Sequence, residues 1–139
     1  MPLQTAIDDL VREAALMLSA EALVSDDERP AWTLRLADGL PFDIEHDDAQ
    51  GRMVIVCPVG EAAPAARERL YERLLQYNFL WHDTGGLRMA LSGTPGRVVL
   101  MLELPLPGLA PARLCAVLAN MGEIRQSWHD ILEAAAAVS

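Results

Sequence analysis

The fold is decided by one stretch, WTLRLADGLPFDIEH (residues 32–46), in which apolar and polar side chains alternate on both sides of a turn. Alternation with a period of two is typical of a strand with one buried face. The dipeptide Asp38-Gly39 lies between the two runs and marks the turn. The stretch therefore predicts a β-hairpin with one apolar face.

The sequence on either side of this hairpin adds a helix and a third strand. Residues 3–20 carry apolar side chains at helical spacing, and the charged, proline-ending run 25–30 predicts a loop after them. Downstream, a turn at residues 47–51 leads into the continuous apolar run Met53–Cys57. A run of this kind predicts a central strand buried on both faces, ended by Pro58 and Gly60.

The second half predicts a helix over residues 64–80, a turn at 81–86, strands at 87–91 and 97–104, and a last helix over 114–132. Consecutive strands joined by tight turns pair antiparallel. The sequence thus predicts a single α+β domain over residues 1–139. Its expected order is helix-strand-strand-strand-helix-strand-strand-helix, with an antiparallel twisted sheet covered by helices.

Composition restricts the class of partner. Twenty Asp and Glu against eleven Lys and Arg give a formal charge of -9, which disfavours nucleic acid and anionic lipid. No apolar stretch approaches the about 20 residues that span a bilayer, and the N-terminus lacks the pattern of a signal peptide. We expect a cytoplasmic protein in which Cys57 and Cys115 are buried thiols.

No set of residues predicts an active site or a bound cofactor. His46, His82 and His129 are scattered without metal-ligand spacing. The tripeptide Asp83-Thr84-Gly85 invites comparison with aspartic proteases, but it follows a predicted helix and reads as a turn. A small hydrolase that uses Asp83 with His82 or His129 remains the enzymatic alternative to a binding protein.

The element order, the size and the acidity together resemble the class I type III secretion chaperones, the family that includes the chaperone of the translocated intimin receptor. The run Leu74-Leu75-Gln76-Tyr77-Asn78 is similar to the family's Leu-Leu-x-x-Asn ending of the second helix. Met121-Gly122 and Trp128 resemble its C-terminal helix. The proline-dense link 104–107 and the alanine-rich tail 134–137 depart from the family pattern.

The resemblance implies a bacterial cytoplasmic chaperone without cofactors that binds the N-terminal chaperone-binding segment of a secreted effector. The chaperone would keep that segment non-globular and soluble and promote its export, with a transient contact to the secretion ATPase. It also implies a homodimer joined through the second helix and the following strand. The residues implied at this interface are Leu70, Leu74, Tyr77, Leu87, Met89 and Leu91.

Apolar side chains of the first helix and the first strands are our candidates for the effector-binding grooves. They are Ile7, Leu10, Trp32, Leu34, Leu36, Phe42, Ile44 and Val54. An acidic rim would favour basic residues beside the apolar anchors of the effector. A non-secretory regulatory module of the same fold, binding a folded partner, is the alternative within the class of binding proteins.

Overall fold

The computed structural model describes residues 2–138, with side chains described from Thr5 onward. The chain forms α1 (Pro2–Met17), β1 (Ala22–Ser25), β2 (Ala31–Arg35), β3 (Pro41–Asp47) and β4 (Arg52–Glu61), with the single-turn 3-10 helix η1 (Asp48–Gln50) before β4. A second 3-10 turn, η2 (Pro64–Ala66), leads into α2 (Arg67–Phe79). The chain continues through α3 (Trp81–Thr84), β5 (Arg88–Leu91), β6 (Arg97–Pro105) and α4 (Pro111–Ala137).

The six strands form one sheet in the order β1-β2-β3-β4-β6-β5, and every neighbouring pair is antiparallel. The hairpin expected at residues 32–46 is formed by β2 and β3, with Trp32 opposite Ile44 and Leu34 opposite Phe42. The sheet ends at β1 on one side and at β5 on the other.

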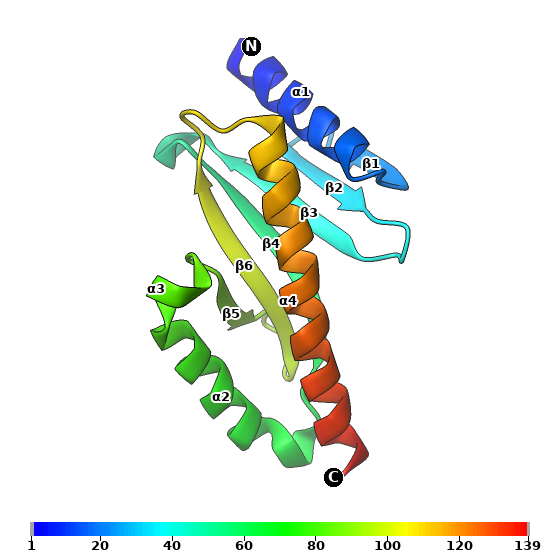
Figure 1. Cartoon of the computed structure of the whole chain (residues 1–139), viewed down its shortest axis with the longest axis vertical. Coiled ribbons are helices and arrows are strands. Elements are labelled where there is room, and N and C mark those ends of the chain that lie inside the picture. Colours follow the sequence, from blue (N-terminus) through cyan, green and yellow to red (C-terminus); the bar gives the residue numbers. More distant parts are fainter. Residues whose placement is uncertain (1, 139) are drawn as a thin grey trace.

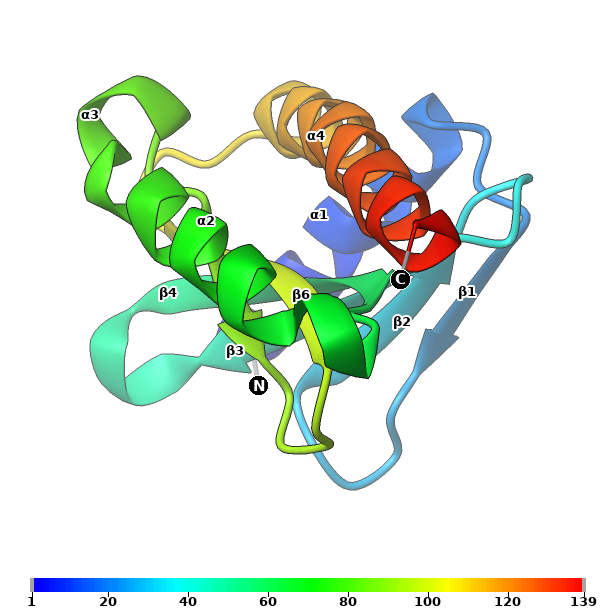
Figure 2. The ribbon, with the colours of Figure 1, turned by 90° about the horizontal axis from the view of Figure 1, so that it is seen from below.

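The three long helices lie on one face of this sheet, as the view along its length shows (Figure 2). α4 runs diagonally over the strands, α1 packs across its N-terminal end, and α2 lies beside β5 (Figure 1). Alternate residues of β2, β3 and β4 point into the core under these helices, and Ile44, Met53, Ile55 and Leu100 of β6 are almost fully buried. Burial of this apolar face is the main stabilising term of the fold.

Specific polar contacts fix each long helix on the sheet. The Trp32 indole Nε1 donates to Asp8 Oδ1 at 2.8 Å, which joins α1 to β2. On α4, Arg125 Nε donates to the carbonyl oxygen of Pro58 at 3.0 Å, and His129 Nδ1 lies 2.7 Å from the carbonyl oxygen of Val59. These two contacts hold α4 against β4 at the point where the register of β4 with β6 shifts.

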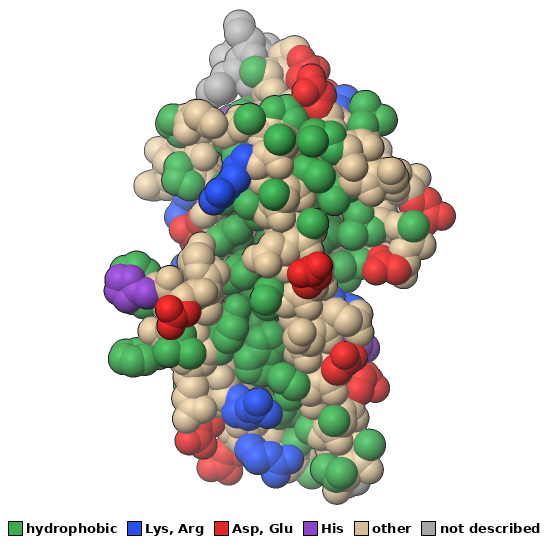
Figure 3. Space-filling model, in the orientation of Figure 1, with side chains coloured by type: hydrophobic (Ala, Val, Ile, Leu, Met, Phe, Trp, Pro, Cys, Tyr) green, Lys and Arg blue, Asp and Glu red, His purple; other side chains and the backbone are tan. Residues whose placement is uncertain are grey.

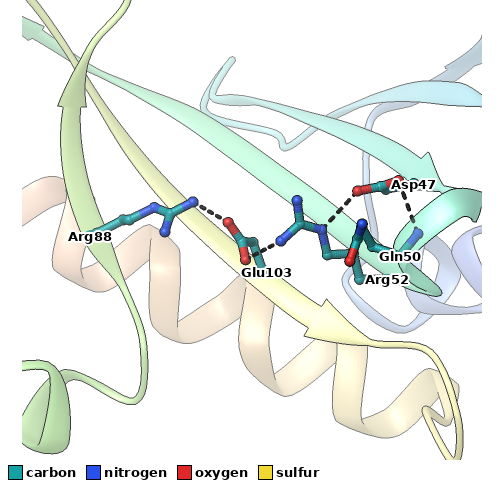
Figure 4. A network of polar contacts seen from close by, with 5 residues as sticks. All are labelled: Asp47, Gln50, Arg52, Arg88 and Glu103. Atoms are coloured by element: carbon teal, nitrogen blue, oxygen red, sulfur yellow. Dashed lines mark hydrogen bonds and ion pairs between the residues drawn. The ribbon is translucent and has the colours of Figure 1, made fainter.

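The other face of the sheet carries no helix of the described chain, and a line of ion pairs crosses it (Figure 4). Glu103 of β6 pairs with Arg88 of β5 on one side and with Arg52 of β4 on the other. Arg52 Nε lies 2.8 Å from Asp47 Oδ2, so the network spans four strands. The expectation that the Met53–Cys57 strand is buried on both faces was therefore wrong, because Val54 and Val56 stay partly exposed on this open face.

The predicted fold class and element order are confirmed, with two additions. The short edge strand β1 precedes the predicted hairpin, and the turn expected at residues 81–86 contains the one-turn helix α3. β4 also continues through Pro58 and Gly60 to Glu61. It does so because the register shift between these two residues accommodates a proline, which cannot donate to the ladder.

Candidate functional site

A groove, here called the α1 groove, runs between α1 and the link from β6 to α4. Its volume is about 690 Å³. Ile7 and Leu10 of α1 face Leu106 and Leu109 of the link across it. Asp9, Glu13 and Asp48 also line it, and all three side chains are exposed. The groove is thus apolar inside and acidic at its rim.

The β1 edge is a second candidate surface. β1 pairs with β2 on one side only, so its other backbone edge faces outward (Figure 1). Two large apolar side chains are exposed at this strand: Leu16, at the end of α1, which lines a hollow with Ala22 and Leu23, and Val24 on β1 itself. An unpaired strand edge next to apolar side chains can accept an additional strand from a partner.

The third surface, here called the α2–α3 patch, consists of Leu75, Phe79, Leu80 and Trp81. Phe79 is 82% exposed and Leu75 is 70% exposed, although both are large apolar side chains. They lie four residues apart on the outer side of α2, and Leu91 of β5 adds a further half-exposed side chain. Exposed apolar side chains gathered in this way usually mark a protein-binding surface.

Hydrophobic side chains also lie along the middle of the helical face, between α4 and the α2–α3 segment (Figure 3). A smaller hollow of about 230 Å³ lies there, lined by Leu87 and Leu102 on one side and by Val117 and Met121 of α4 on the other. This hollow exposes less apolar surface than the α1 groove.

The structure does not bring all eight predicted effector-binding residues together in one groove, although Trp32, Ile44 and Val54 line a common hollow of about 380 Å³. Ile7 and Leu10 line the α1 groove. Leu34 and Phe42 are fully buried beneath the helices, and Ile44 and Trp32 are nearly so, because these strand positions face the core. Leu36 is half-buried at the end of the hairpin, and Val54 lies on the open face of the sheet. Leu34 and Phe42 therefore do not fit a role in direct contact with a partner.

The residues predicted for the dimer interface lie mostly on the inner side of α2 and β5. Leu70, Leu74, Leu87 and Met89 are buried in the core of this chain, so they cannot form an exposed interface. Tyr77 is half-buried and meets Trp128 of α4 edge to face, with ring centroids 5.4 Å apart. Of the six, Leu91 alone is exposed. The outward side chains Leu75 and Phe79 were not among the predicted residues, although their spacing of four places them on one helical face.

The candidates for catalysis are dispersed. Asp83 and His82 are exposed on the one-turn helix α3, where the His82 ring stacks on Trp81, and His129 is held against β4. Burial raises the pKa of the Cys57 thiol to about 12, which makes it a poor nucleophile. Within residues 2–138, no three His, Cys, Asp or Glu side chains are grouped as metal ligands. In the same range, no helix has the length and hydrophobicity of a membrane span.

The chain belongs to the Tir chaperone protein (CesT) family. The model of that family matches residues 10–129, which extend from the middle of α1 to the C-terminal half of α4. The matched region includes Asn78 and Trp128, on which the resemblance seen in the sequence partly rests. Among curated protein sequences, none matches this chain.

Solved structures with the same fold include chains from two protein complexes. A chain of the ExsC–ExsE complex has a TM-score of 0.78 and 19% identity, over 95% of this chain and 97% of that chain. A chain of the HopA1–SchA chaperone–effector complex has a TM-score of 0.72 and 16% identity, over 94% and 98% of the two chains. YbjN from E. coli, for which a role in transcription regulation has been suggested, has a TM-score of 0.61 and 19% identity, over 93% and 91%.

Proposed function

We propose that this protein is a type III secretion chaperone that binds the N-terminal segment of an exported effector and keeps that segment non-globular until export. The observation that carries the proposal is membership of a family described as chaperones, over residues 10–129. The structural similarity to a chain of a chaperone–effector complex supports the same function.

Two of the exposed surfaces suit an extended segment. The α1 groove offers apolar contacts to side chains of the segment, and the β1 edge offers unpaired backbone groups to its main chain. Both surfaces adjoin α1, because Leu10 lines the groove and Leu16 lies beside β1. Each apolar side chain buried in such a contact contributes about 1.5–3 kcal/mol, and ordering the segment opposes part of this gain.

We further propose that the α2–α3 patch is the homodimer interface. Exposed large side chains such as Phe79 and Leu75 gain most from burial against a second copy. Arg69, Glu72 and Arg73 lie on the same helix and are exposed, so opposite charges are available at the rim of a symmetric contact. This assignment replaces the buried residues Leu70, Leu74, Leu87 and Met89 by the outward side chains of the same elements.

In this proposal the protein acts in the bacterial cytoplasm, makes transient contact with the secretion ATPase and catalyses no reaction. Asp83 then has no chemical role. Replacement of Asp83 by Ala should leave binding of the exported segment unchanged, whereas loss of a hydrolytic activity in this variant would support the enzymatic alternative.

A regulatory module that binds a folded partner is the second candidate function. The observation that favours it is the similarity to YbjN, which shares the fold over nearly the whole chain. The two candidates differ in what they bind, because a chaperone holds an unfolded segment and a regulator of this kind holds a folded domain.

The test is capture of partners by the tagged chain from a lysate of its own organism, followed by mass spectrometry and by export assays on a strain that lacks the chain. The proposal predicts one exported protein, held by its N-terminal region, whose export falls when the chain is deleted. Capture of a folded DNA-binding or signalling protein, with unchanged export, would overturn it.

A further inference from the structure

The rim of the α1 groove carries carboxylates that form no ion pair with a Lys or Arg of the described chain. Asp9 and Glu13 lie four residues apart on α1, so they share one face of the helix and form one wall of the groove. Asp48, in η1, belongs to the same lining. Among the twelve described residues that line the groove there is no Lys or Arg.

The neighbouring acids form ion pairs with arginine, whereas the carboxylates that line the groove do not. Asp8 is paired with Arg12 at 2.7 Å and accepts from Trp32, and Asp47 is paired with Arg52. Within residues 5–138, in contrast, neither Asp9 nor Glu13 has an ion-pair partner, and Asp48 has only the His46 ring nitrogen at 3.8 Å. Of these five neighbouring acids, the three without an arginine partner are therefore the ones that line the groove.

The interior of the groove is apolar at the same place. Ile7 and Leu10 form the side nearest to α1, and Leu106, Pro107 and Leu109 form the side nearest to the link. A short stretch of apolar residues of a bound segment can enter between these walls. The residues that flank this stretch in the segment then lie beside carboxylates. With a net charge of -9, the whole chain attracts cationic segments and repels anionic ones.

We propose that the α1 groove selects the part of the exported segment in which an apolar anchor is flanked on both sides by Arg or Lys. This inference rests on the proposed function and specifies the chemistry of its ligand. Apolar burial holds the anchor, and the carboxylates of α1 and η1 favour the basic flanks and exclude acidic ones.

The experiment measures binding of two labelled probe peptides to the full chain at pH 7.5, at low and at high salt. Both probes share one apolar core of alternating leucine and serine. One is flanked on both sides by arginine, and the other by glutamate. Two triple variants carry the same change of net charge. The rim variant has Asp9→Asn, Glu13→Gln and Asp48→Asn, and the control has Asp27→Asn, Glu28→Gln and Glu123→Gln, all exposed and outside the groove.

The arginine-flanked probe should bind the parent chain at low salt roughly tenfold more tightly than it binds the rim variant, with much less difference at high salt. The control variant should bind it nearly as tightly as the parent, because its three substitutions lie outside the groove. Since the two variants change the overall charge equally, a loss confined to the rim variant reports the groove and not the net charge. The glutamate-flanked probe should bind at least tenfold more weakly than the arginine-flanked one.

Equal binding of the two probes, or equal loss in the rim and control variants, would overturn the inference. The proposed function is judged separately by capture of the exported protein, which does not depend on these probes. Export of a captured protein whose bound segment has acidic flanks would leave the chaperone function standing and remove the charge selection.

Discussion

The side-chain amide of Asn78 forms two hydrogen bonds with the backbone of Met89. Asn78 Nδ2 donates to the Met89 carbonyl oxygen at 2.9 Å, and the Met89 amide donates to Asn78 Oδ1 at 2.8 Å. β5 is an edge strand, so the end of α2 takes the place of a neighbouring strand at this residue. The asparagine of the family-like Leu-Leu-x-x-Asn run thereby fixes α2, and with it the α2–α3 patch, on the sheet.

Replacement of Asn78 by Ala should lower the free energy of unfolding by about 1–3 kcal/mol, because it leaves both backbone groups of Met89 without their partner. Amide exchange at Met89 should also become faster. Denaturant unfolding and hydrogen exchange measure these effects, at a fixed protein concentration. Gln76→Ala, at an exposed position of the same helix, is the control and should change stability by less than about 0.5 kcal/mol. Equal effects of the two variants would contradict this role.

Gly60 is required where α4 approaches β4. A Cβ atom on Gly60 would lie 3.2 Å from His129 Nδ1 and 3.3 Å from Leu132 Cδ1, and the φ angle of 153° is unfavourable for other residues. Gly60→Ala should therefore destabilise the protein by about 1–3 kcal/mol. Thermal unfolding measures the change.

Gly122→Ala is the matched control for Gly60→Ala. Gly122 lies within α4, and nothing lies within 4 Å of a Cβ placed there. This substitution should be neutral or should stabilise the protein by up to about 1 kcal/mol, because alanine favours the helix. A loss of stability at Gly122 as large as that at Gly60 would show that contact with α4 is not the cause.

The contact between Asp8 and Trp32 makes stability depend on pH. The hydrogen bond from Trp32, followed by the contact with Arg12, lowers the pKa of Asp8 below its ordinary value of 3.8. A carboxyl group with a lowered folded-state pKa stabilises the fold above the ordinary value, and this contribution is lost as the pH falls through the folded value. Asp8→Asn should thus be less stable than the parent by about 1 kcal/mol at neutral pH.

The difference between Asp8→Asn and the parent should shrink below the ordinary carboxyl pKa of 3.8. Denaturant unfolding at neutral and at acidic pH tests this. Asp9→Asn is the control, since Asp9 has no described hydrogen-bond or ion-pair partner, and its stability should parallel that of the parent. A constant difference for Asp8→Asn across the whole pH range would contradict the assigned cause.

The α2–α3 patch predicts the oligomeric state. Light scattering of the parent chain should give about twice its mass of 15.2 kDa. Phe79→Glu should give a monomer, because it places a charge at the centre of the proposed interface. Leu16→Glu, at an equally exposed apolar position beside β1, should remain a dimer. A monomeric parent, or equal dissociation by both variants, would refute the interface.

The sequence predicted the elements well where apolar periodicity was strong, and poorly where it was weak. β1 was missed because it has four residues, three of them exposed, so no alternation marks it. The helix α2 was found, but its apolar side chains form two stripes. Periodicity alone could not tell which stripe, that of Leu70 and Leu74 or that of Leu75 and Phe79, faces the sheet.

The candidate site was harder to predict for a related reason. Side chains of the hairpin such as Leu34 and Phe42 are as hydrophobic as groove residues, and the pattern that reveals a strand also buries one of its faces. The α1 groove depends on the link at residues 106–111, which is near α1 in space and about one hundred positions away in sequence. No local pattern contains such a relationship. Ile7 and Leu10 were identified because they lie on the stripe of α1.

The most direct test of the central claim compares two parts of the captured exported protein in titration calorimetry with the purified chain: its N-terminal segment and its folded remainder. The account predicts that the segment binds, with one segment per two chains, and that the folded remainder does not. Binding of the folded remainder without the segment would contradict the chaperone function and favour a regulatory module.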